Sequence, residues 1–421
     1  MAAGNNAGDI VIAGAGLAGA TAAQTLRSEG YTGPVTLLGT ESHPPYLRPP
    51  LSKEYLLGKA DEDEVPVAPE DWYSENDVDL RLGVSVTGIQ PDARRVQLSD
   101  GTSLGYGSLL LATGASPRRL PVPGSELTGV STFRTWDDSR RLRRALEQGG
   151  KNVVMIGSGW IGMELAAAAA TYGNKVTLLG REDIPLAAAI GPELGRFFRS
   201  VHEANGVTFR LPASAREITG EAGAVTGVVD DSGEFLPADI VVIAVGVEPR
   251  TELARAAGLD LDNGILTDAS LRTSAPGIFA AGDVANALHP FTGEHHRSEH
   301  WANALNGGKL VAKAMLGQDA VFSTVPYFYT DQFDVSMEYS GFPTLAEGAE
   351  PVIRGSLERK EFLAFWQQDS RVVAGMSVNW PKKAKPGAQK TIKALISARS
   401  PIPSERLADE SVGLDQLLPE A

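Results

Sequence analysis

Short apolar runs that end at glycine recur along this chain, and they predict buried strands of a parallel sheet. Two of them, residues 9–13 and 152–156, are each followed by a glycine-rich turn and then by a run of small residues that favours a helix. We expect helices at 20–28 and from about Ser52, and a hairpin turn at Asp100-Gly101. Further strands are predicted at 35–38, 84–89, 95–98, 109–112, 175–179, 241–245 and 278–281.

Both glycine-rich turns carry the pattern G-x-G-x-x-G, as GAGLAG at 14–19 and GSGWIG at 157–162. In a strand–turn–helix context this pattern indicates a dinucleotide site. The first glycine allows the tight turn, the second lets the backbone approach a pyrophosphate, and the third packs the helix on the strand. The phosphates then bind N–H groups at the helix N-terminus. Two such units predict two dinucleotides in one chain, with chemistry between them.

The order of the elements predicts an α/β fold in which one nucleotide domain is interrupted by another. We expect the first domain at 1–117 and 246–325 and the second at 118–245. Prolines 117, 121 and 123 mark the linker between them. Pro326 opens a C-terminal module at 326–421 that is rich in aromatic residues and then in lysine.

Composition excludes several classes of function. The 421 residues contain no cysteine, which rules out a protein disulfide, an iron–sulfur centre held by this chain and thiol catalysis. A net charge of −14 argues against nucleic-acid binding. No apolar run approaches the roughly 20 residues of a membrane span, and residues 1–8 lack a secretory signal, so we expect no membrane contact and a cytoplasmic location.

Four further segments accompany the two fingerprints: PYLRPPLSK at 45–53, ATGASPR at 112–118, AAGDVA at 280–285 and RSEHWANA at 297–304. Together they resemble the FAD-dependent ferredoxin reductases that serve bacterial cytochrome P450s and aromatic-ring dioxygenases. The resemblance covers nearly the whole chain. It implies a glutathione-reductase-like fold, with FAD on the first domain, NAD(P)H on the second and an α+β C-terminal domain. Hydride would pass to the flavin, which would release electrons singly to a ferredoxin.

The resemblance also implies roles for individual residues at the FAD. Glu41 lies 22 residues beyond Gly19, where a carboxylate can accept a hydrogen bond from a ribose hydroxyl. Arg48 and Arg134 would neutralise phosphate charge. Val86 would lie near the adenine, Asp283 at the ribitol and Trp301 beside the flavin ring. The remaining expected cofactor-binding positions are Gly14, Gly16, Ala18, Gly19, Thr113, Gly157, Gly159, Gly162 and Gly246.

Lys53 and Glu164 are the expected catalytic pair. Taken alone, each is an ordinary surface charge. In the family that this chain resembles, the matching lysine sits near flavin N5 and pairs with the matching glutamate, where a cation stabilises a reduced flavin. No general acid or nucleophile is required for the hydride step.

The second nucleotide site departs from the family pattern. NADH-dependent members commonly end the strand after the fingerprint with an acid, and here that place is Gly180, followed by Arg181. Loss of the acid and gain of an arginine favour a 2′-phosphate, and hence NADPH. Glu182 and Asp183 oppose that preference.

The histidine-rich segment 289–300 contains H-x-x-E-H at 296–300, a pattern also found in zinc proteases. Because the same residues belong to the reductase segment, we expect no metal site.

The C-terminal module indicates the partner. Residues 371–406 carry eight basic side chains and one acid, a net charge of +7 in an acidic chain. This local reversal of sign would attract an acidic ferredoxin. The expected docking residues are Lys382, Lys383, Lys385, Lys390 and Lys393. The segment 327–332 has tyrosine at 329, where the family usually has tryptophan near the flavin.

Two other interpretations remain open. A rubredoxin reductase or a monodehydroascorbate-type reductase would share the fold and differ only in the acceptor. A redox-sensing protein would bind FAD and NAD(P)H and report their state without rapid turnover.

Overall fold

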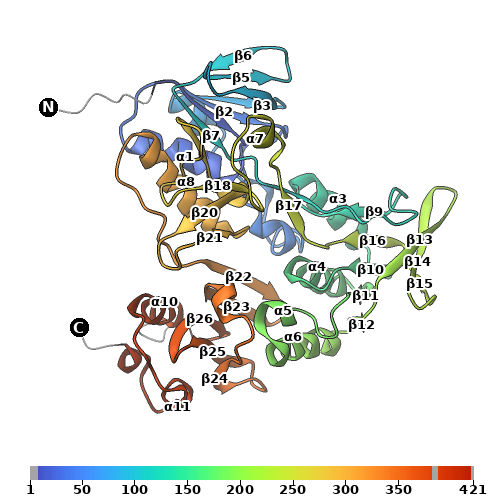
Figure 1. Ribbon diagram of the computed structural model, residues 1–421. Helices are drawn as coiled ribbons and strands as arrows, with labels where there is room; N and C mark the ends of the chain where they lie inside the picture. Colours follow the sequence, from blue (N-terminus) through green and yellow to red (C-terminus); the bar gives the residue numbers. More distant parts are fainter. Residues whose placement is uncertain (1–7, 382–386, 419–421) are drawn as a thin grey trace. The chain divides into compact units, whose positions relative to one another are not determined.

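The computed structural model describes residues 8–381 and 387–418 of the chain. These divide into two compact units (Figure 1). The first unit contains residues up to 49, 61–116 and 247–324. The second contains residues 50–60, 117–246 and the described residues from 325 onward. The chain therefore crosses between the units five times, and the short segment 50–60 groups with the second unit.

A five-stranded parallel sheet forms the centre of the first unit, in the order β19-β7-β1-β2-β3. Its strands are β1 (Ile10–Ala13), β2 (Val35–Gly39), β3 (Val78–Leu82), β7 (Ser108–Leu111) and β19 (Ile278–Ala280). The middle strand β1 is buried along its whole length, as expected for a parallel strand covered on both faces. The sheet thereby fixes the place at which its carboxyl-terminal turns emerge.

Helices α1 (Leu17–Ser28) and α8 (Trp301–Met315) pack against each other and share a core with this sheet (Figure 1). Small residues allow the close approach, because a Cβ at Gly308 would lie 2.5 Å from the carbonyl oxygen of Ala18. The other elements of this unit are η2 (Glu62–Glu64), α2 (Asp71–Glu75), β4 (Val86–Gln90), β5 (Arg95–Leu98), β6 (Ser103–Gly105), α7 (Glu252–Ala256), β18 (Ile265–Thr267), η3 (Gly282–Val284), β20 (Ala285–His289) and β21 (Glu294–Arg297).

The second unit repeats this plan in its middle section with a parallel sheet in the order β12-β11-β10-β16-β9. Its strands are β9 (Val130–Thr132), β10 (Asn152–Ile156), β11 (Lys175–Leu179), β12 (Thr208–Arg210) and β16 (Ile240–Ile243). The other elements of this section are α3 (Trp136–Leu146), α4 (Trp160–Thr171), α5 (Ala187–Ile190), α6 (Pro192–Ala204), β13 (Ala215–Glu221), β14 (Ala224–Asp230) and β15 (Phe235–Pro237). The strands β8 (Ala115–Pro117) and β17 (Val247–Pro249) pair where the chain passes between the units.

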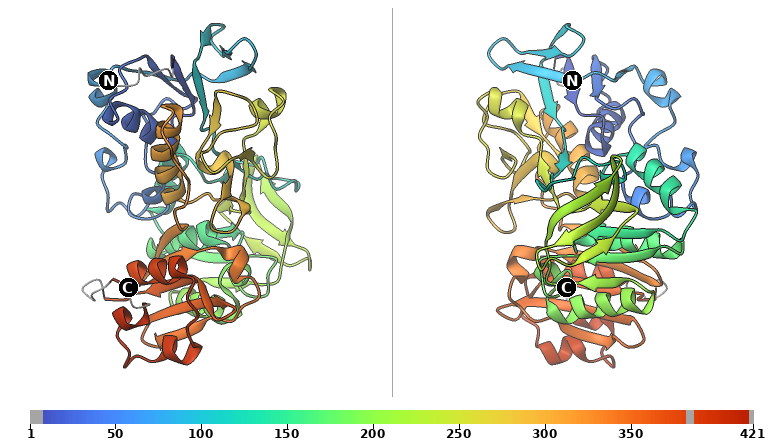
Figure 2. Two further views of the ribbon diagram at one scale, coloured as in Figure 1. Left: turned by 60° about the vertical axis from the view of Figure 1, so that its left-hand side comes forward. Right: turned by 90° about the vertical axis from the view of Figure 1, so that its right-hand side faces the viewer.

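The C-terminal part of the second unit is an antiparallel sheet in the order β22-β23-β26-β25-β24, with α10 packed on β23 and β26 (Figure 2). Aromatic contacts join this sheet to the parallel one. The ring centroids of Trp160 and Phe328 are 5.3 Å apart, and those of Phe197 and Phe362 are 5.1 Å apart. The elements are β22 (Tyr327–Gln332), β23 (Val335–Gly341), α9 (Pro343–Ala346), β24 (Val352–Ser356), β25 (Glu361–Gln368), β26 (Arg371–Val378), α10 (Ala388–Ala398), α11 (Ser404–Ala408) and η4 (Leu414–Leu417).

The predicted α/β fold is confirmed, and the predicted strands form within two residues at either end. The hairpin at Asp100-Gly101 also forms, with Gly101 at φ +84°. One element was wrong. The helix expected from Ser52 is only the 3₁₀ turn η1 (Pro49–Ser52), followed by hydrogen-bonded turns. Contacts to other parts of the second unit hold this segment instead, through Ser139 Oγ to Leu51 O and Tyr172 Oη to Leu56 O.

A buried arginine anchors the C-terminal end of the described chain. Arg354 on β24 is 4% exposed, and its guanidinium donates to the carbonyl oxygens of Leu407, Asp409 and Val412. Burial is the main cause that lowers the pKa of Arg354. Three carbonyl oxygens pointing at one planar fork require a guanidinium rather than an ammonium.

We expect Arg354→Lys to lower the free energy of unfolding by about 1.5–3 kcal/mol, because hydrogen bonds from a buried charged group are lost. Urea unfolding followed by circular dichroism measures this change. Arg359→Lys, at an exposed position on the same module, is the matched control and should leave the midpoint unchanged. Equal midpoints for the two variants would contradict the anchoring role.

Candidate functional site

The two glycine fingerprints have nearly the same geometry. Gly14 and Gly157, each directly after the middle strand of its sheet, have φ values of +124° and +121°. A Cβ at Gly14 would lie 2.1 Å from Ala112 O, and one at Gly157 would lie 2.3 Å from Ala244 O. Only glycine fits such a conformation at such a close approach. Any side chain at Gly14 or Gly157 would therefore clash with the backbone opposite it.

The second and third glycines of each fingerprint also have distinct surroundings. A Cβ at Gly19 or Gly162 would lie about 2 Å from the carbonyl oxygen of the first glycine, which packs each helix on its turn. At Gly16 and Gly159, the N-cap residues of α1 and α4, a Cβ would have no atom of a non-neighbouring described residue within 4 Å. This open space in front of a helix N-terminus fits a pyrophosphate, which accepts hydrogen bonds from the free N–H groups there.

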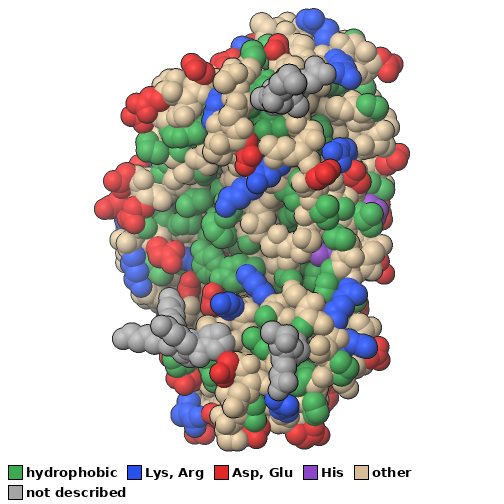
Figure 3. Space-filling view, turned by 90° about the vertical axis from the view of Figure 1, so that its left-hand side faces the viewer, with side chains coloured by type: hydrophobic (Ala, Val, Ile, Leu, Met, Phe, Trp, Pro, Cys, Tyr) green, Lys and Arg blue, Asp and Glu red, His purple; other side chains and the backbone are tan. Residues whose placement is uncertain are grey.

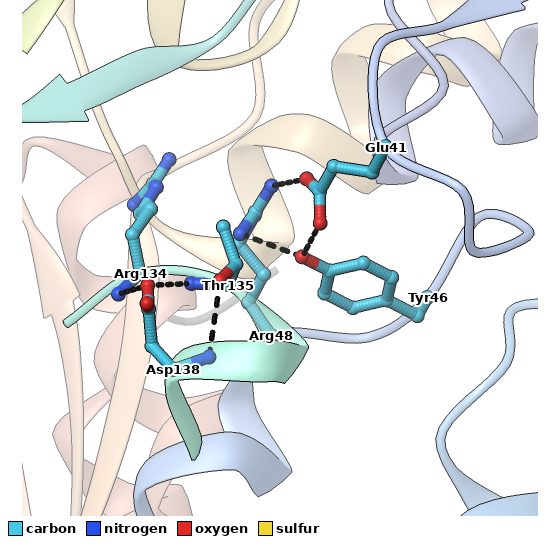
Figure 4. Close-up of polar contacts among 6 residues, drawn as sticks. All are labelled: Glu41, Tyr46, Arg48, Arg134, Thr135 and Asp138. Atoms are coloured by element: carbon cyan, nitrogen blue, oxygen red, sulfur yellow. Dashed lines mark hydrogen bonds and ion pairs between the residues drawn. The ribbon is translucent and has the colours of Figure 1, made fainter. Parts of the chain in front are cut away.

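Glu41, Tyr46 and Arg48 form one hydrogen-bonded group in the first unit (Figure 4). The Tyr46 hydroxyl donates to Glu41 Oε2 at 2.7 Å, and Arg48 Nη2 lies 3.4 Å from Glu41 Oε1. Arg48 Nη1 also donates to the Tyr46 hydroxyl, and its guanidinium lies over the Tyr46 ring. Because β2 runs parallel to β1, the turn that carries Glu41 emerges beside the Gly14 turn. The structure thus brings together the residues expected at the ribose and at a phosphate.

Arg134 precedes a helix whose N-terminus is capped (Figure 4). The Thr135 hydroxyl accepts from Asp138 N, while Asp138 Oδ2 accepts from the backbone N–H groups of Thr135 and Arg134. This capping box begins α3 and fixes the backbone at Arg134.

Four other residues expected at the FAD lie in the first unit, three on helices or strands and one in a turn. Thr113 follows β7, and its hydroxyl donates to Arg250 O at 2.9 Å. Val86 begins β4 and is half-buried. Asp283 lies in η3 and is 9% exposed, and Trp301 begins α8. Gly246, another expected cofactor-binding position, follows β16 with φ +94° and belongs to the second unit.

The position expected to carry an acid in NADH-dependent proteins, Gly180, has no room for a side chain. A Cβ there would lie 2.4 Å from Ser158 Oγ and 2.8 Å from Leu211 Cδ2. Arg181 and Glu182 follow directly and are exposed. Although Glu182 is exposed, partial desolvation by neighbouring groups raises the pKa of its carboxyl. A side chain at position 180 would therefore require Ser158 and Leu211 to shift. Ser158 was not singled out from the sequence.

Comparison of the two sheets identifies a counterpart for Glu41. The register pairs Ala13 with Leu38 in the first unit and Ile156 with Leu179 in the second. The residues two positions beyond the following glycine are therefore Glu41 and Glu182.

Lys53 and Glu164 form a buried ion pair in the second unit. Lys53 Nζ lies 2.9 Å from Glu164 Oε1, and the two side chains are 6% and 4% exposed. Glu164 also accepts hydrogen bonds from the hydroxyls of Ser52 and Thr330. The Glu164 carboxylate, on α4, therefore has three donors: one in η1, one directly after η1 and one in β22. Neither Ser52 nor Thr330 was singled out from the sequence, because no local pattern links residues 52, 164 and 330.

Tyr329 lies beside this pair, with Lys53 Nζ 5.3 Å from its ring centroid. Burial, followed by the negative charges of Glu54, Asp331 and Glu164, raises the pKa of Tyr329 to about 12. The phenol is neutral at neutral pH, as tyrosine ordinarily is, and presents its ring face to the ammonium.

The five lysines expected to form the docking surface do not share one environment. Lys382, Lys383 and Lys385 lie outside the described residues. Lys390 on α10 is exposed. Lys393 is half-buried, its Nζ lies 4.5 Å from the Tyr327 ring centroid, and burial lowers its pKa. Acidic and basic side chains are interspersed on the face that Figure 3 shows.

The histidine motif at 296–300 has no metal-like arrangement. His296 Nε2 contacts Thr292 Oγ1 at 2.7 Å, and Glu299 pairs with Arg297. Burial lowers the pKa of His300 to about 4. Across residues 8–381 and 387–418 we find no cluster of three acidic or histidine side chains suited to a metal ion.

None of the helices in the described part of the chain combines the length and the apolar character that crossing a membrane requires.

Comparisons with known proteins agree with this architecture. A family model described as pyridine nucleotide-disulphide oxidoreductase matches residues 8–308, and one described as reductase C-terminal matches residues 327–418. The ferredoxin--NAD(+) reductase component of the anthranilate 1,2-dioxygenase system of Burkholderia cepacia is 37% identical, over 98% of this chain and 100% of that protein. A rubredoxin-NAD(+) reductase of Pseudomonas putida is also 37% identical, over 89% of this chain and 96% of its own length.

A solved structure of the covalent complex between putidaredoxin reductase and putidaredoxin superposes with a TM-score of 0.92 at 35% identity. The match covers 97% of this chain and 98% of that one. The similarity therefore includes both nucleotide-binding sections and the C-terminal sheet.

Proposed function

Because the chain belongs to the pyridine nucleotide-disulphide oxidoreductase family, and to the branch of it that contains ferredoxin reductases, we propose that it is an FAD-dependent ferredoxin--NAD(P)+ reductase. It carries electrons from NAD(P)H to a small iron–sulfur protein that supplies a cytochrome P450 or a ring-hydroxylating oxygenase.

The observation that carries this proposal is the duplicated glycine turn in a chain without cysteine. Two turns with φ near +120° at the first glycine and open space at the second make two dinucleotide sites. Without any cysteine, the chain cannot pass electrons through a dithiol of its own, as a disulphide reductase does. Electrons that enter from a nicotinamide must therefore leave to an acceptor outside this chain.

The protein residues bind and orient the cofactors and supply charge. When bound, FAD supplies the redox chemistry, since it can take up a hydride and give up electrons one at a time. We propose that Gly14, Gly16, Ala18, Gly19 and Glu41 hold its adenosine diphosphate part. Lys53 supplies positive charge where negative charge develops, and a charge fixed in a buried site is more effective than one in water.

The family alone does not select the acceptor, because its members include rubredoxin reductases as well as ferredoxin reductases. The net charge of +7 over residues 371–406 favours an acidic protein partner. The second interpretation, from another class of protein, is a redox sensor without rapid turnover. Slow reduction of its flavin would distinguish it from a reductase.

Two neighbouring side chains bear on the choice of nicotinamide cofactor. Arg181 suits a 2′-phosphate, whereas Glu182, the counterpart of Glu41, suits a 2′-hydroxyl. We propose that Arg181 recognises NADPH and that Glu182 recognises NADH. Position 180 is not expected to contribute a side-chain contact, because a Cβ there would clash with Ser158.

The purified protein should contain one non-covalent FAD per chain, and Asp283→Ala should reduce its retention, because the buried Asp283 carboxylate can no longer accept a hydrogen bond from a ribitol hydroxyl of the cofactor. Absorbance near 450 nm per chain after gel filtration measures the loss. Asp262→Ala, at an exposed position of the same unit, is the control. A folded but colourless wild type would contradict the proposed function.

Arg181→Ala should raise KM for NADPH and leave KM for NADH nearly unchanged, while Glu182→Gln should raise KM for NADH. Each variant serves as the control for the other, since both lie on the same exposed turn. Steady-state reduction of ferricyanide with each donor gives the four comparisons. Equal effects on both donors would show that neither side chain distinguishes them.

Electron transfer to an acidic ferredoxin should slow as salt increases, because exposed charges are screened beyond about 8 Å at physiological ionic strength. Changing Lys382, Lys383 and Lys385 together to Glu should raise KM for ferredoxin and flatten the salt dependence. Reduction of ferricyanide is the control, since a small acceptor needs no protein-sized docking face. If the triple variant reduces ferredoxin normally at low salt, docking occurs elsewhere.

A further inference from the structure

A chain of hydrogen bonds with one direction ends at the Glu164 carboxylate. Gln332 Nε2 donates to Thr330 Oγ1 at 3.1 Å, and Thr330 Oγ1 donates to Glu164 Oε1 at 2.6 Å. A hydroxyl has a single proton. Because Thr330 gives that proton to Glu164, it accepts from the amide group of Gln332, which fixes the direction of both bonds. Gln332 and Thr330 are each 1% exposed, so water does not compete for them.

The chain of donors meets the other two donors at the same carboxylate. Lys53 Nζ shares Oε1 with Thr330, while Ser52 Oγ donates to Oε2. Two charges withdrawn from water are tolerated only when their geometry is good and further hydrogen bonds satisfy their remaining sites. Three donors to one carboxylate meet that requirement, and they leave the carboxylate one orientation.

We propose that Thr330, supported by Gln332, is a positioning residue for the reaction. It holds the Glu164 carboxylate in the orientation that keeps the Lys53 ammonium at its place beside the Tyr329 ring. The proposal rests on the proposed function in one respect, namely that Lys53 provides the charge for hydride transfer. Thr330 itself lies on β22, in the C-terminal sheet, so that sheet contributes directly to the ion pair.

The contact is tested first without any turnover. Thr330→Val keeps the shape of the side chain and removes its hydroxyl, which should increase the unfolding equilibrium constant about ten-fold, as expected for a hydrogen bond to a charged group. Thr391→Val is the matched control, since Thr391 is equally buried in the same module and its hydroxyl has no partner among the described residues. Urea unfolding of the full chain measures both variants.

A double-mutant cycle then separates this contact from general loss of packing. If Thr330 acts through Glu164, Thr330→Val should add little to the unfolding constant once Glu164→Gln is present, because contacting residues are not additive. If the two substitutions instead change the unfolding constant by independent factors, the proposal is overturned, whether or not the protein binds a flavin.

The positioning role is tested by anaerobic stopped-flow reduction of the flavin. Thr330→Val should slow the limiting rate about ten-fold with little change in the apparent affinity for the nicotinamide, since misplacement of an ångström costs up to ~100-fold. Thr330→Ser should restore the rate, and Lys53→Met/Thr330→Val should be no slower than Lys53→Met. An unchanged limiting rate, together with a positive unfolding cycle, would overturn the positioning role. It would leave the proposed function intact, which fails only if the wild type is not reduced at all.

Discussion

The ion pair between Lys53 and Glu164 is the constraint on which the arrangement of the second unit depends. Two opposite charges that are 6% and 4% exposed cost several kcal/mol of desolvation each, unless they are paired and hydrogen-bonded. The donors that satisfy Glu164 come from chain positions 52, 53 and 330. The segment 50–60, α4 and the C-terminal sheet must therefore fold onto one another, and they group as one compact unit.

The aromatic core of this unit makes the same connection without charge. Trp160 begins α4 and contacts Phe198 on α6 and Phe328 on β22, with ring centroids 5.5 and 5.3 Å apart. Glu164 lies four residues beyond Trp160, on the same face of the helix. The apolar contact brings β22 against α4. The hydrogen bond from Thr330 to Glu164 then fixes the position of β22 along the helix. Packing and polar specificity thus act on the same pair of elements.

The sequence predicted what local backbone geometry dictates and missed what distant contacts decide. The two nucleotide turns were predictable because a glycine with φ near +120° and a helix after it leave a pattern within six residues. The supposed helix at Ser52 was wrong because tertiary hydrogen bonds to Leu51 and Leu56 hold that segment as turns. Lys393 counted as one of several docking charges, yet its ammonium lies over the Tyr327 ring. Ser158 limits the space at position 180 only because the end of strand β11 places Gly180 beside it.

The absence of cysteine gives these electrostatic contacts their functional weight. The matching family model is described as pyridine nucleotide-disulphide oxidoreductase, yet this chain contains no thiol. Around Lys53 stand Glu164, which is paired with it, and Tyr329, whose pKa burial raises to about 12. An ionised phenol there would place a second negative charge next to Glu164 and oppose the build-up of negative charge during reduction. The phenol is neutral at neutral pH, as tyrosine ordinarily is, so the Glu164 carboxylate is the negative group paired with the ammonium. Under the proposed mechanism, the orientation of that carboxylate would set the field that Lys53 provides.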